Sequence, residues 1–313
     1  MRSIKNISSS DIEKVIAGYR YGRYLEDRSL DREASRRLVE DKINEYVQRD
    51  DTDYVVEHAG QEEIQGLLLF KLSPWDTEHF GIKTSLIEYV LVREPEYEAR
   101  ISIANRLLLK YQAWCELNKI RFVFVKISSS DLPVLHAFEK NGFCFMENWI
   151  FNKYDLTNLD TRSQQSFDLR LMKPSDLDPM LSYSRGALTT HRFHADSYIP
   201  LEKAETLYEK WILTAFHDPH QKILVYESHN RPVAFMIYHP YDLRSYFNLR
   251  FAMWKMALMD PRLKEKGSAI IFSFLFYIII KRKAWMLSTR ESALGISFLS
   301  IYIMSWISKT FAR

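Results

Sequence analysis

The sequence predicts an α/β protein built from two consecutive domains. The chain has 313 residues, and single hydrophobic cores stop growing beyond about 250 residues. Strand-like and helix-like patterns alternate along the first half. After a polar, aperiodic stretch, the same order of elements begins again. We therefore predict a first domain at 1–156, a linker at 157–166 and a second domain at 167–313.

The first half opens with a charged amphipathic stretch and continues as alternating strands and helices. A helix is expected to begin at residues 8–11 and to run as one stretch to about Arg49. Asp131 is expected to cap a later helix, which Asn141-Gly142 would end. The other predicted elements are strands at 54–58, 64–72, 84–92, 121–127 and 143–154, and helices at 101–117 and 131–140.

The second half repeats the order of strand, helices and hairpin. A turn at His229-Asn230-Arg231 joins two of its strands. The predicted elements are a strand at 167–172, helices at 174–188 and 201–216, and strands at 222–227, 232–238 and 251–259.

Composition and charge argue against several classes of protein. With 47% hydrophobic and 27% charged residues, the chain is typical of globular proteins. A net charge of +3 gives no reason to expect nucleic acid as a partner. Cys115 and Cys144 do not make a disulfide framework and fit the reducing cytoplasm, where we place the protein. The apolar run at 268–280 is shorter than the ~20 residues that span a bilayer, so we expect no membrane partner. The histidines form no metal-binding set.

A basic turn containing a glycine follows the strand predicted at 251–259. Small residues there would let backbone amides approach a diphosphate closely, and the start of the next helix would favour its negative charge. The alternative is an ordinary basic surface turn. The candidate cofactor-binding residues are Ala257, Leu258, Met259, Lys264, Glu265, Lys266, Gly267, Ser268 and Ala269.

This segment resembles the acetyl-CoA signature of the GNAT superfamily of N-acetyltransferases, in which Lys264, Gly267 and Ala269 fill the defining places. The resemblance implies two tandem GNAT-like domains, each a mixed, mostly antiparallel sheet flanked by helices. It also implies acetyl-CoA as co-substrate, with no metal, and a primary amine as acceptor. In this family a bulge on the fourth strand, which maps to 256–259, offers an amide to the reacting oxygen.

Two further segments are similar to dTDP-fucosamine N-acetyltransferases. They are residues 191–200, with the helix that follows, and residues 73–81. The resemblance implies a nucleotide-linked amino sugar as acceptor and a role in polysaccharide biosynthesis, and it leaves a homodimer open. A polyamine, a peptide or an antibiotic amine is the alternative acceptor.

Three residues are candidates for binding the acceptor. Arg192 could pair with a diphosphate, and Trp254 could stack on a base or a sugar. His194 could accept a proton from the amine, because the pKa of histidine lies near neutrality. The alternatives are a surface arginine, a core tryptophan and a histidine at the edge of the core.

The first domain departs from the GNAT pattern where the phosphate loop would lie. Residues 92–100 contain no glycine and include three glutamates, which would repel a diphosphate. Phe138 stands where catalytic members carry a tyrosine that protonates the leaving thiolate. We therefore predict a scaffold domain.

The tail after Gly267 also departs from the family, because the expected helix, strand, tyrosine-bearing helix and closing strands do not follow. Reading 283–309 one base out of frame permits a sequence that aligns without gaps with 119–144 and places a tyrosine opposite Phe138. We infer a frame shift near 264–270, which leaves the second domain incomplete after about 267. The alternative is a hydrophobic C-terminal extension. Tyr302 is the nearest substitute acid, and we expect weak or no turnover, as in a catalytically inactive GNAT-scaffold protein.

Overall fold

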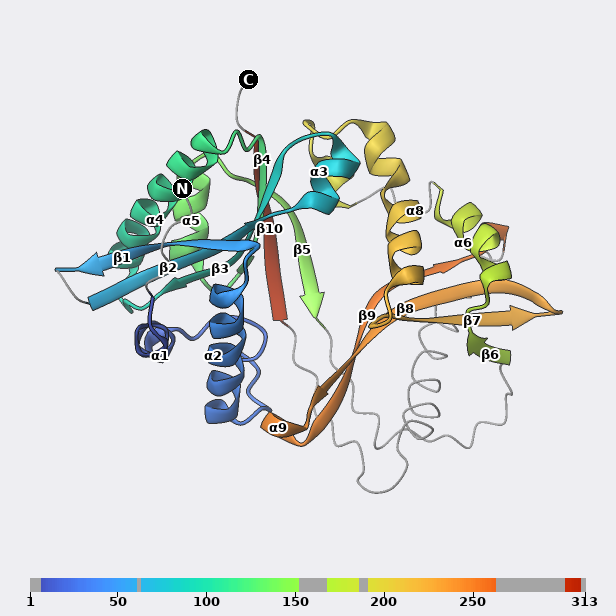
Figure 1. The fold of residues 1–313 in the computed structure, drawn as a ribbon, viewed down its shortest axis with the longest axis horizontal. Coiled ribbons are helices and arrows are strands. Elements are labelled where there is room, and N and C mark those ends of the chain that lie inside the picture. The colour runs from blue at the N-terminus through green and yellow to red at the C-terminus, as the bar shows by residue number, and fades with distance from the viewer. Residues whose placement is uncertain (1–6, 61–62, 152–167, 186–190, 263–301, 311–313) are drawn as a thin grey trace. The chain divides into compact units, whose positions relative to one another are not determined.

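The computed structural model describes residues 7–60, 63–151, 168–185, 191–262 and 302–310, and it confirms the predicted α/β class. The described residues form two sheets flanked by helices (Figure 1).

The chain divides into two compact units. Unit 1 comprises Met1–Asn152, Ala195–Pro200 and Ser300–Arg313, and unit 2 comprises Lys153–His194 and Leu201–Leu299. The first division lies close to the predicted end of the first domain at 156. The C-terminal segment does not follow the predicted boundaries, because its residues contact unit 1 rather than the second domain predicted at 167–313.

Unit 1 contains a six-stranded mixed sheet. Its strands are antiparallel to their neighbours, except that β3 and β4 run parallel. In spatial order the strands are β1 (Thr52–Ala59), β2 (Glu63–Leu72), β3 (Thr84–Val92), β4 (Phe122–Ser128), β10 (Tyr302–Thr310) and β5 (Cys144–Phe151).

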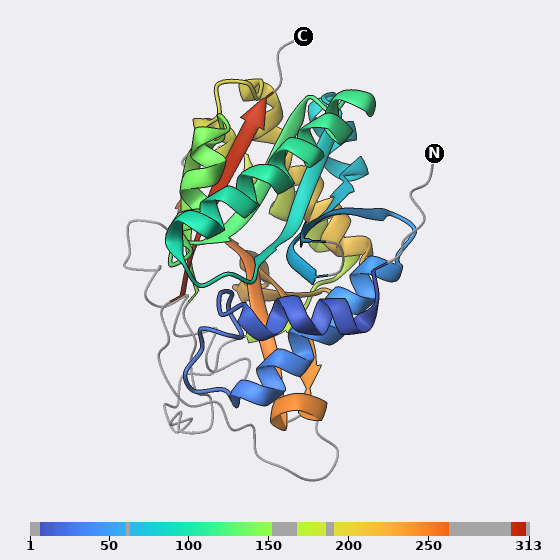
Figure 2. The same cartoon turned by 90° about the vertical axis from the view of Figure 1, so that its left-hand side faces the viewer.

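Helices cover both faces of this sheet because successive side chains of a strand point to opposite faces. Along β2, Leu67 and Leu69 pack in one core with α1 and α2, whereas Leu68 and Phe70 pack in the other with α4 and α5. Figures 1 and 2 show the two pairs of helices on opposite sides. The helices of unit 1 are α1 (Ser9–Gly18), α2 (Arg32–Gln48), α3 (Pro74–Phe80), α4 (Tyr97–Leu117) and α5 (Leu132–Lys140).

The single stretch predicted from residue 8 to Arg49 is wrong, because the structure breaks it into α1 and α2. Ser8 caps α1 with a reciprocal capping box, and Asp31 caps α2 by accepting from the Ala34 amide at 2.8 Å. Gly22, between the two helices, has φ +102°, a conformation that strongly favours glycine. Charge periodicity alone does not show this turn.

Unit 2 contains a four-stranded antiparallel sheet, and its core packs on α6 and α8 through Ile223, Val225, Phe235 and Ile237. The helix predicted at 174–188 is instead a short 3₁₀ turn, η1 (Pro174–Asp176), followed by α6 (Leu177–Ser184). The remaining elements are β6 (Asp168–Leu171), α7 (Arg192–Ala195), α8 (Leu201–His217), β7 (Lys222–Ser228), β8 (Arg231–Leu243), α9 (Arg244–Phe247) and β9 (Leu249–Met259).

Gly18 is predicted to resist substitution by alanine, although alanine normally stabilises a helix relative to glycine. A Cβ at this position would lie 2.6 Å from the Arg93 carbonyl oxygen. We expect Gly18→Ala to lower the free energy of unfolding by about 1–3 kcal/mol, as overpacking does. Chemical denaturation measures the change. Ala17→Gly, on the exposed side of α1, is the control that gives the ordinary effect of exchanging alanine and glycine in this helix. A stabilised Gly18→Ala variant would contradict the close approach.

Candidate functional site

In each unit, three consecutive strands pair antiparallel, β1–β2–β3 in unit 1 and β7–β8–β9 in unit 2. The third strand of each series, β3 or β9, carries a β-bulge. In unit 2, Ile237 lies opposite Met256 and Tyr238 lies opposite Trp254, so Lys255 is the extra residue of β9. The predicted position, 256–259, was therefore too late by one residue. A bulge bends its strand and takes a backbone group out of the regular ladder, so it can direct an amide toward a ligand.

Unit 1 has a bulge at the matching place. Leu69 lies opposite Tyr89 and Phe70 lies opposite Ile87, so Glu88 is the extra residue of β3. Counted from the end of its strand, Glu88 occupies the position that Lys255 occupies in β9.

A second pair of bulges ties the end of each third strand to its neighbour. Gln65 is the extra residue near the start of β2, and Val233 is the extra residue near the start of β8. The Gln65 carbonyl accepts the Arg93 amide at 2.9 Å, and the Val233 carbonyl accepts the Asp260 amide at 2.8 Å. In both units, the first residue after the third strand is thereby fixed by the same contact.

The predicted cofactor residues of unit 2 lie in two places. Ala257, Leu258 and Met259 are the last residues of β9. Leu258 is buried in the core with Met256, whereas Ala257 and Met259 point to the other face of the sheet. Lys264, Glu265, Lys266, Gly267, Ser268 and Ala269 lie outside the described residues.

A cluster of charged side chains lies directly before the predicted phosphate loop. It was not predicted from the sequence. The Asp260 carboxylate, only 1% exposed, accepts from the Arg262 guanidinium at 2.8 and 2.9 Å and pairs with Arg231. It also accepts from the Arg262 amide at 3.0 Å. The Arg262 guanidinium is the main cause that lowers the pKa of Asp260 to about 2. The Asp-Pro-Arg order, typical of a turn that aspartate closes onto its own backbone, was the available signal.

The predicted acceptor-binding residues lie on different elements of the chain. Arg192 and His194 belong to α7, and His194 Nδ1 shares a hydrogen bond of 2.7 Å with His191 Nε2. The His191 ring packs edge-on against Tyr208 of α8, with centroids 4.9 Å apart. Trp254 lies on β9, directly before the bulge residue, and is 44% exposed.

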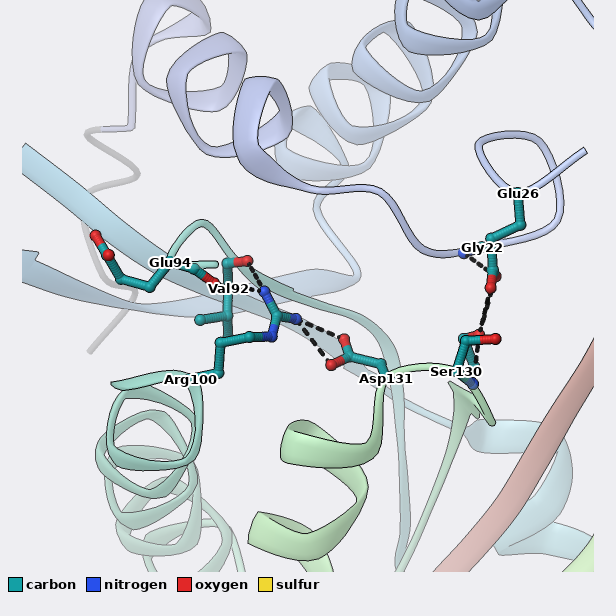
Figure 3. A network of polar contacts seen from close by, with 8 residues as sticks. Gly22, Glu26, Val92, Glu94, Arg100, Ser130 and Asp131 are labelled. Carbon is teal, nitrogen blue, oxygen red and sulfur yellow. Dashed lines mark hydrogen bonds and ion pairs between the residues drawn. The ribbon is translucent and has the colours of Figure 1, made fainter. Parts of the chain in front are cut away.

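In unit 1, a buried ion pair lies at the corresponding exit of the third strand (Figure 3). β3 and β4 pair only up to Ile87 and Val125, although both strands continue beyond these residues. Past that point, the Arg100 guanidinium donates to the Val92 carbonyl at 2.7 Å and to both Asp131 oxygens at 2.8 and 2.7 Å. Both side chains are almost fully buried.

This network differs from the predicted helix cap. Asp131 stands at the start of α5, but its carboxylate is bound by Arg100. Burial raises the pKa of Asp131, and the Arg100 charge opposes that shift. Beside it, Glu26 accepts from the Gly22 amide at 2.7 Å and from the Ser128 hydroxyl at 2.9 Å (Figure 3).

The start of α4 is filled by a carboxylate of the chain itself. Glu96 accepts from the Ala99 amide at 2.8 Å, in the place where a helix start would attract a ligand anion. Phe138 is fully buried and packs on Phe143 with centroids 4.8 Å apart, so no acid stands there. These contacts agree with the absence of glycine in this loop.

Tyr302, the predicted substitute acid of the second domain, begins β10 and lies opposite Phe151 in the sheet of unit 1. Its backbone is therefore part of unit 1 rather than of the unit that contains β9.

Comparison with known proteins gives a fold but no close relative. No protein-family model and no curated protein matches the chain. A GCN5-related N-acetyltransferase from Sphaerobacter thermophilus matches 97% of this chain and 94% of its own length, with a TM-score of 0.56 and 12% identity. The chain has the GNAT fold.

Two other solved structures are more distant. A GCN5-related N-acetyltransferase from Kribbella flavida matches 97% of this chain and 70% of its own, with 12% identity and a TM-score of 0.42. The PaiA N-acetyltransferase from Thermoplasma acidophilum, solved in complex with coenzyme A, matches 44% of this chain and 87% of its own, with 18% identity and a TM-score of 0.33.

Two kinds of feature are absent from the described residues. No described helix is both long enough and apolar enough to cross a membrane. Within the same residues, no group of three or more histidine, cysteine, aspartate and glutamate side chains could hold a metal ion. The apolar run at 268–280 lies outside the described part of the chain.

Asp260→Asn is expected to destabilise unit 2 by about 1–3 kcal/mol at neutral pH, because charged hydrogen bonds to a buried carboxylate are lost. A carboxyl whose pKa falls on folding stabilises the protein above its ordinary pKa, about 3.9, and loses this effect as the pH falls through about 2. The difference between wild type and variant should therefore shrink as the pH falls between these values.

Denaturation at several pH values measures this difference. Asp242→Asn is the matched control, because Asp242 also pairs with a neighbouring arginine, Arg244, but at the surface, where ion pairs contribute little. Equal losses of stability in the two variants would contradict the importance of burial at Asp260.

The buried ion pair of unit 1 can be tested by a double-mutant cycle. Arg100→Met should lower the free energy of unfolding by about 3–5 kcal/mol, because it leaves Asp131 buried without its partner. Adding Asp131→Leu should restore much of that loss. Additive losses in the double variant would show that the two side chains do not act as a pair.

Proposed function

We propose that the protein is an N-acetyltransferase that transfers the acetyl group of acetyl-CoA to a primary amine. The observation that carries this proposal is the bulged strand β9 in a chain with the GNAT fold, which is followed in the sequence by the basic, glycine-containing segment 264–269 that we predict to form a turn. A diphosphate at that turn would extend the thioester along the end of β9, toward the bulge.

In the proposed reaction, the chain would stabilise the oxyanion, support the protonation of the thiolate and hold both reactants together. The amine nitrogen attacks the thioester carbon, the carbon–sulfur bond breaks, and the amine proton leaves. A backbone amide near Lys255 would stabilise the oxyanion that forms. The thiolate takes up a proton as it departs. Holding both reactants in one cleft supplies much of the rate.

For the acceptor, we propose a nucleotide-linked amino sugar. Trp254 supports this proposal, because an exposed indole beside the bulge can stack on a base or a sugar. Arg192 would pair with the diphosphate of the acceptor. His191 Nδ1 accepts from the Phe193 amide, so its Nε2 donates to His194 Nδ1, and His194 could take the amine proton on Nδ1 only after this bond to His191 opens.

Unit 1 is proposed as the scaffold of a tandem GNAT protein. The two units share both bulges and the hydrogen bond that ties the end of the third strand. In unit 1, Glu96 and the Arg100–Asp131 pair occupy the places that a diphosphate would need. A cytoplasmic role in polysaccharide synthesis and a homodimer complete the proposal.

A catalytically inactive GNAT scaffold is the second candidate function. Two observations favour it: Phe138 replaces the expected acid in unit 1, and Tyr302 belongs to the sheet of the same unit. This candidate does not cleave acetyl-CoA, even at high concentration of the protein.

Calorimetry with acetyl-CoA, followed by release of free thiol in the presence of amines, tests both candidates. We expect binding and, because no tyrosine acid has been identified, only weak turnover, which is fastest with a nucleotide-linked amino sugar and slower with polyamines or peptides. Deleting Lys255 removes the bulge and should lower kcat by about 100-fold or more, as loss of an oxyanion donor does. Lys255→Ala keeps the bulge and should leave kcat nearly unchanged.

The outcomes separate the candidates. Binding without thiol release from any acceptor would favour the inactive scaffold. No binding at all would contradict the acetyl-CoA assignment, and equal kcat in the deletion and the alanine variant would contradict the role of the bulge.

A further inference from the structure

Two histidines that lie far apart in the sequence come together near the bulge of unit 2. His220 follows the end of α8, and His239 lies on β8, two residues after Ile237, where the register with β9 shifts. The two rings are nearly parallel, at 26°, with centroids 6.4 Å apart. Within the described residues neither side chain makes a hydrogen bond, so both rings have nitrogens available to a ligand.

Aromatic side chains of the β8–β9 hairpin hold the His239 ring in place. Beyond Tyr238, β8 pairs with β9 but no longer with β7 (Figure 1). In this part of the hairpin the His239 ring packs against Tyr241 with centroids 4.3 Å apart, and Tyr241 packs against Phe251 at 5.8 Å. The three side chains share one face of the sheet, because alternate residues of a strand point to the same side. The position of the histidine ring is therefore set by the hairpin.

The matching place in unit 1 carries an ion pair. Counted from the register shift, His239 of β8 corresponds to Lys71 of β2. The bulge residues of the two units, Lys255 and Glu88, correspond in the same way. In unit 1, Lys71 Nζ lies 2.9 Å from a carboxylate oxygen of Glu88, so the two charges compensate each other. In unit 2 both positions carry basic side chains.

The charges around His239 favour an anion. Burial lowers the pKa of His239, the charges of Lys255 and His220 act in the same direction, and the charge of Asp218 opposes the shift. The two Asp218 oxygens accept from the His220 amide and from the Gln221 side chain, each at 2.8 Å, so the turn that contains this carboxylate already engages it. A ligand anion beside the imidazoles would supply the negative charge that the bulge residue supplies in unit 1.

We propose that His220 and His239 form a phosphate-binding site of unit 2. A phosphate group has several acceptor oxygens, so it can accept hydrogen bonds from two imidazole rings at once, whether it is free or part of a nucleotide. Trp254 lies opposite Tyr238 and therefore on the other face of the sheet. The site is thus separate from the acceptor contact proposed for Trp254, and it does not depend on acetyl transfer.

NMR titration of the histidine rings with inorganic pyrophosphate tests the site in the full chain. Bound phosphate favours the charged imidazolium, so the pKa of His239 should rise. His239→Gln identifies its signal by removing it. His58, which is exposed on β1, is the internal reference and should keep its pKa. An unchanged pKa of His239, or a rise of equal size at His58, would overturn the proposal.

Calorimetry with pyrophosphate provides an independent test. His239→Gln should weaken binding by about tenfold or more, because a charged hydrogen bond is lost. Lys255→Glu keeps the bulge but introduces a competing carboxylate, as in unit 1, and should weaken binding at least as much. His58→Gln makes the same exchange at the surface of unit 1 and should bind as wild type does. Wild-type affinity in both site variants would overturn the proposal.

The source of the phosphate follows from a second titration, with a nucleoside diphosphate. Binding that is tighter than that of pyrophosphate and equally sensitive to His239→Gln would support a nucleotide as the ligand. Equal affinities would support the site with free phosphate as its ligand. Binding of the nucleoside diphosphate that is insensitive to His239→Gln would contradict the assignment of the site to these residues. None of these results depends on whether the chain binds acetyl-CoA.

Discussion

Both units depend on one hydrogen bond that ties the end of the third strand to an extra residue of its neighbour. The bond joins the Arg93 amide to the Gln65 carbonyl in unit 1 and the Asp260 amide to the Val233 carbonyl in unit 2. Because it fixes where the chain leaves the sheet, it sets the direction of the following loop before any residue of that loop contributes. The bulge earlier in the same strand then sets which backbone groups point out of the regular hydrogen-bond ladder.

The two units share this backbone arrangement but differ in the charged side chains beside it. Unit 2 places a buried carboxylate, Asp260, beneath two arginines, so the chain enters the predicted loop with its own acid neutralised and positive charge outermost. Unit 1 places an arginine inside, neutralises it with Asp131 and leaves glutamates at the loop. A ligand diphosphate would find complementary charge only at the first of these entrances.

Periodicity in the sequence predicted most strands and helices and the repeated order of elements, because each element leaves a local pattern. The GNAT fold was implied by the resemblance of a few segments to that superfamily. The bulge of β9 was located only approximately and the other three were not predicted, since one extra residue hardly changes an apolar pattern. The pairing of Arg100 with Asp131 joins different elements, and no local pattern shows it. The break at Gly22 depends on a backbone angle, and the place of Tyr302 depends on a strand pairing with distant partners. Six of the predicted cofactor residues, from Lys264 to Ala269, lie outside the described part of the chain and stay a prediction.

The interior position of β10 has a consequence for biosynthesis. Domains generally fold in order as the ribosome delivers them, with the N-terminal one first. Here the first sheet includes residues that are translated after those of β9, so the facing edges of β4 and β5 stay open until Tyr302–Thr310 have left the ribosome. A nascent chain of this kind exposes aggregation-prone edges while unit 2 is synthesised and is a natural client for chaperones.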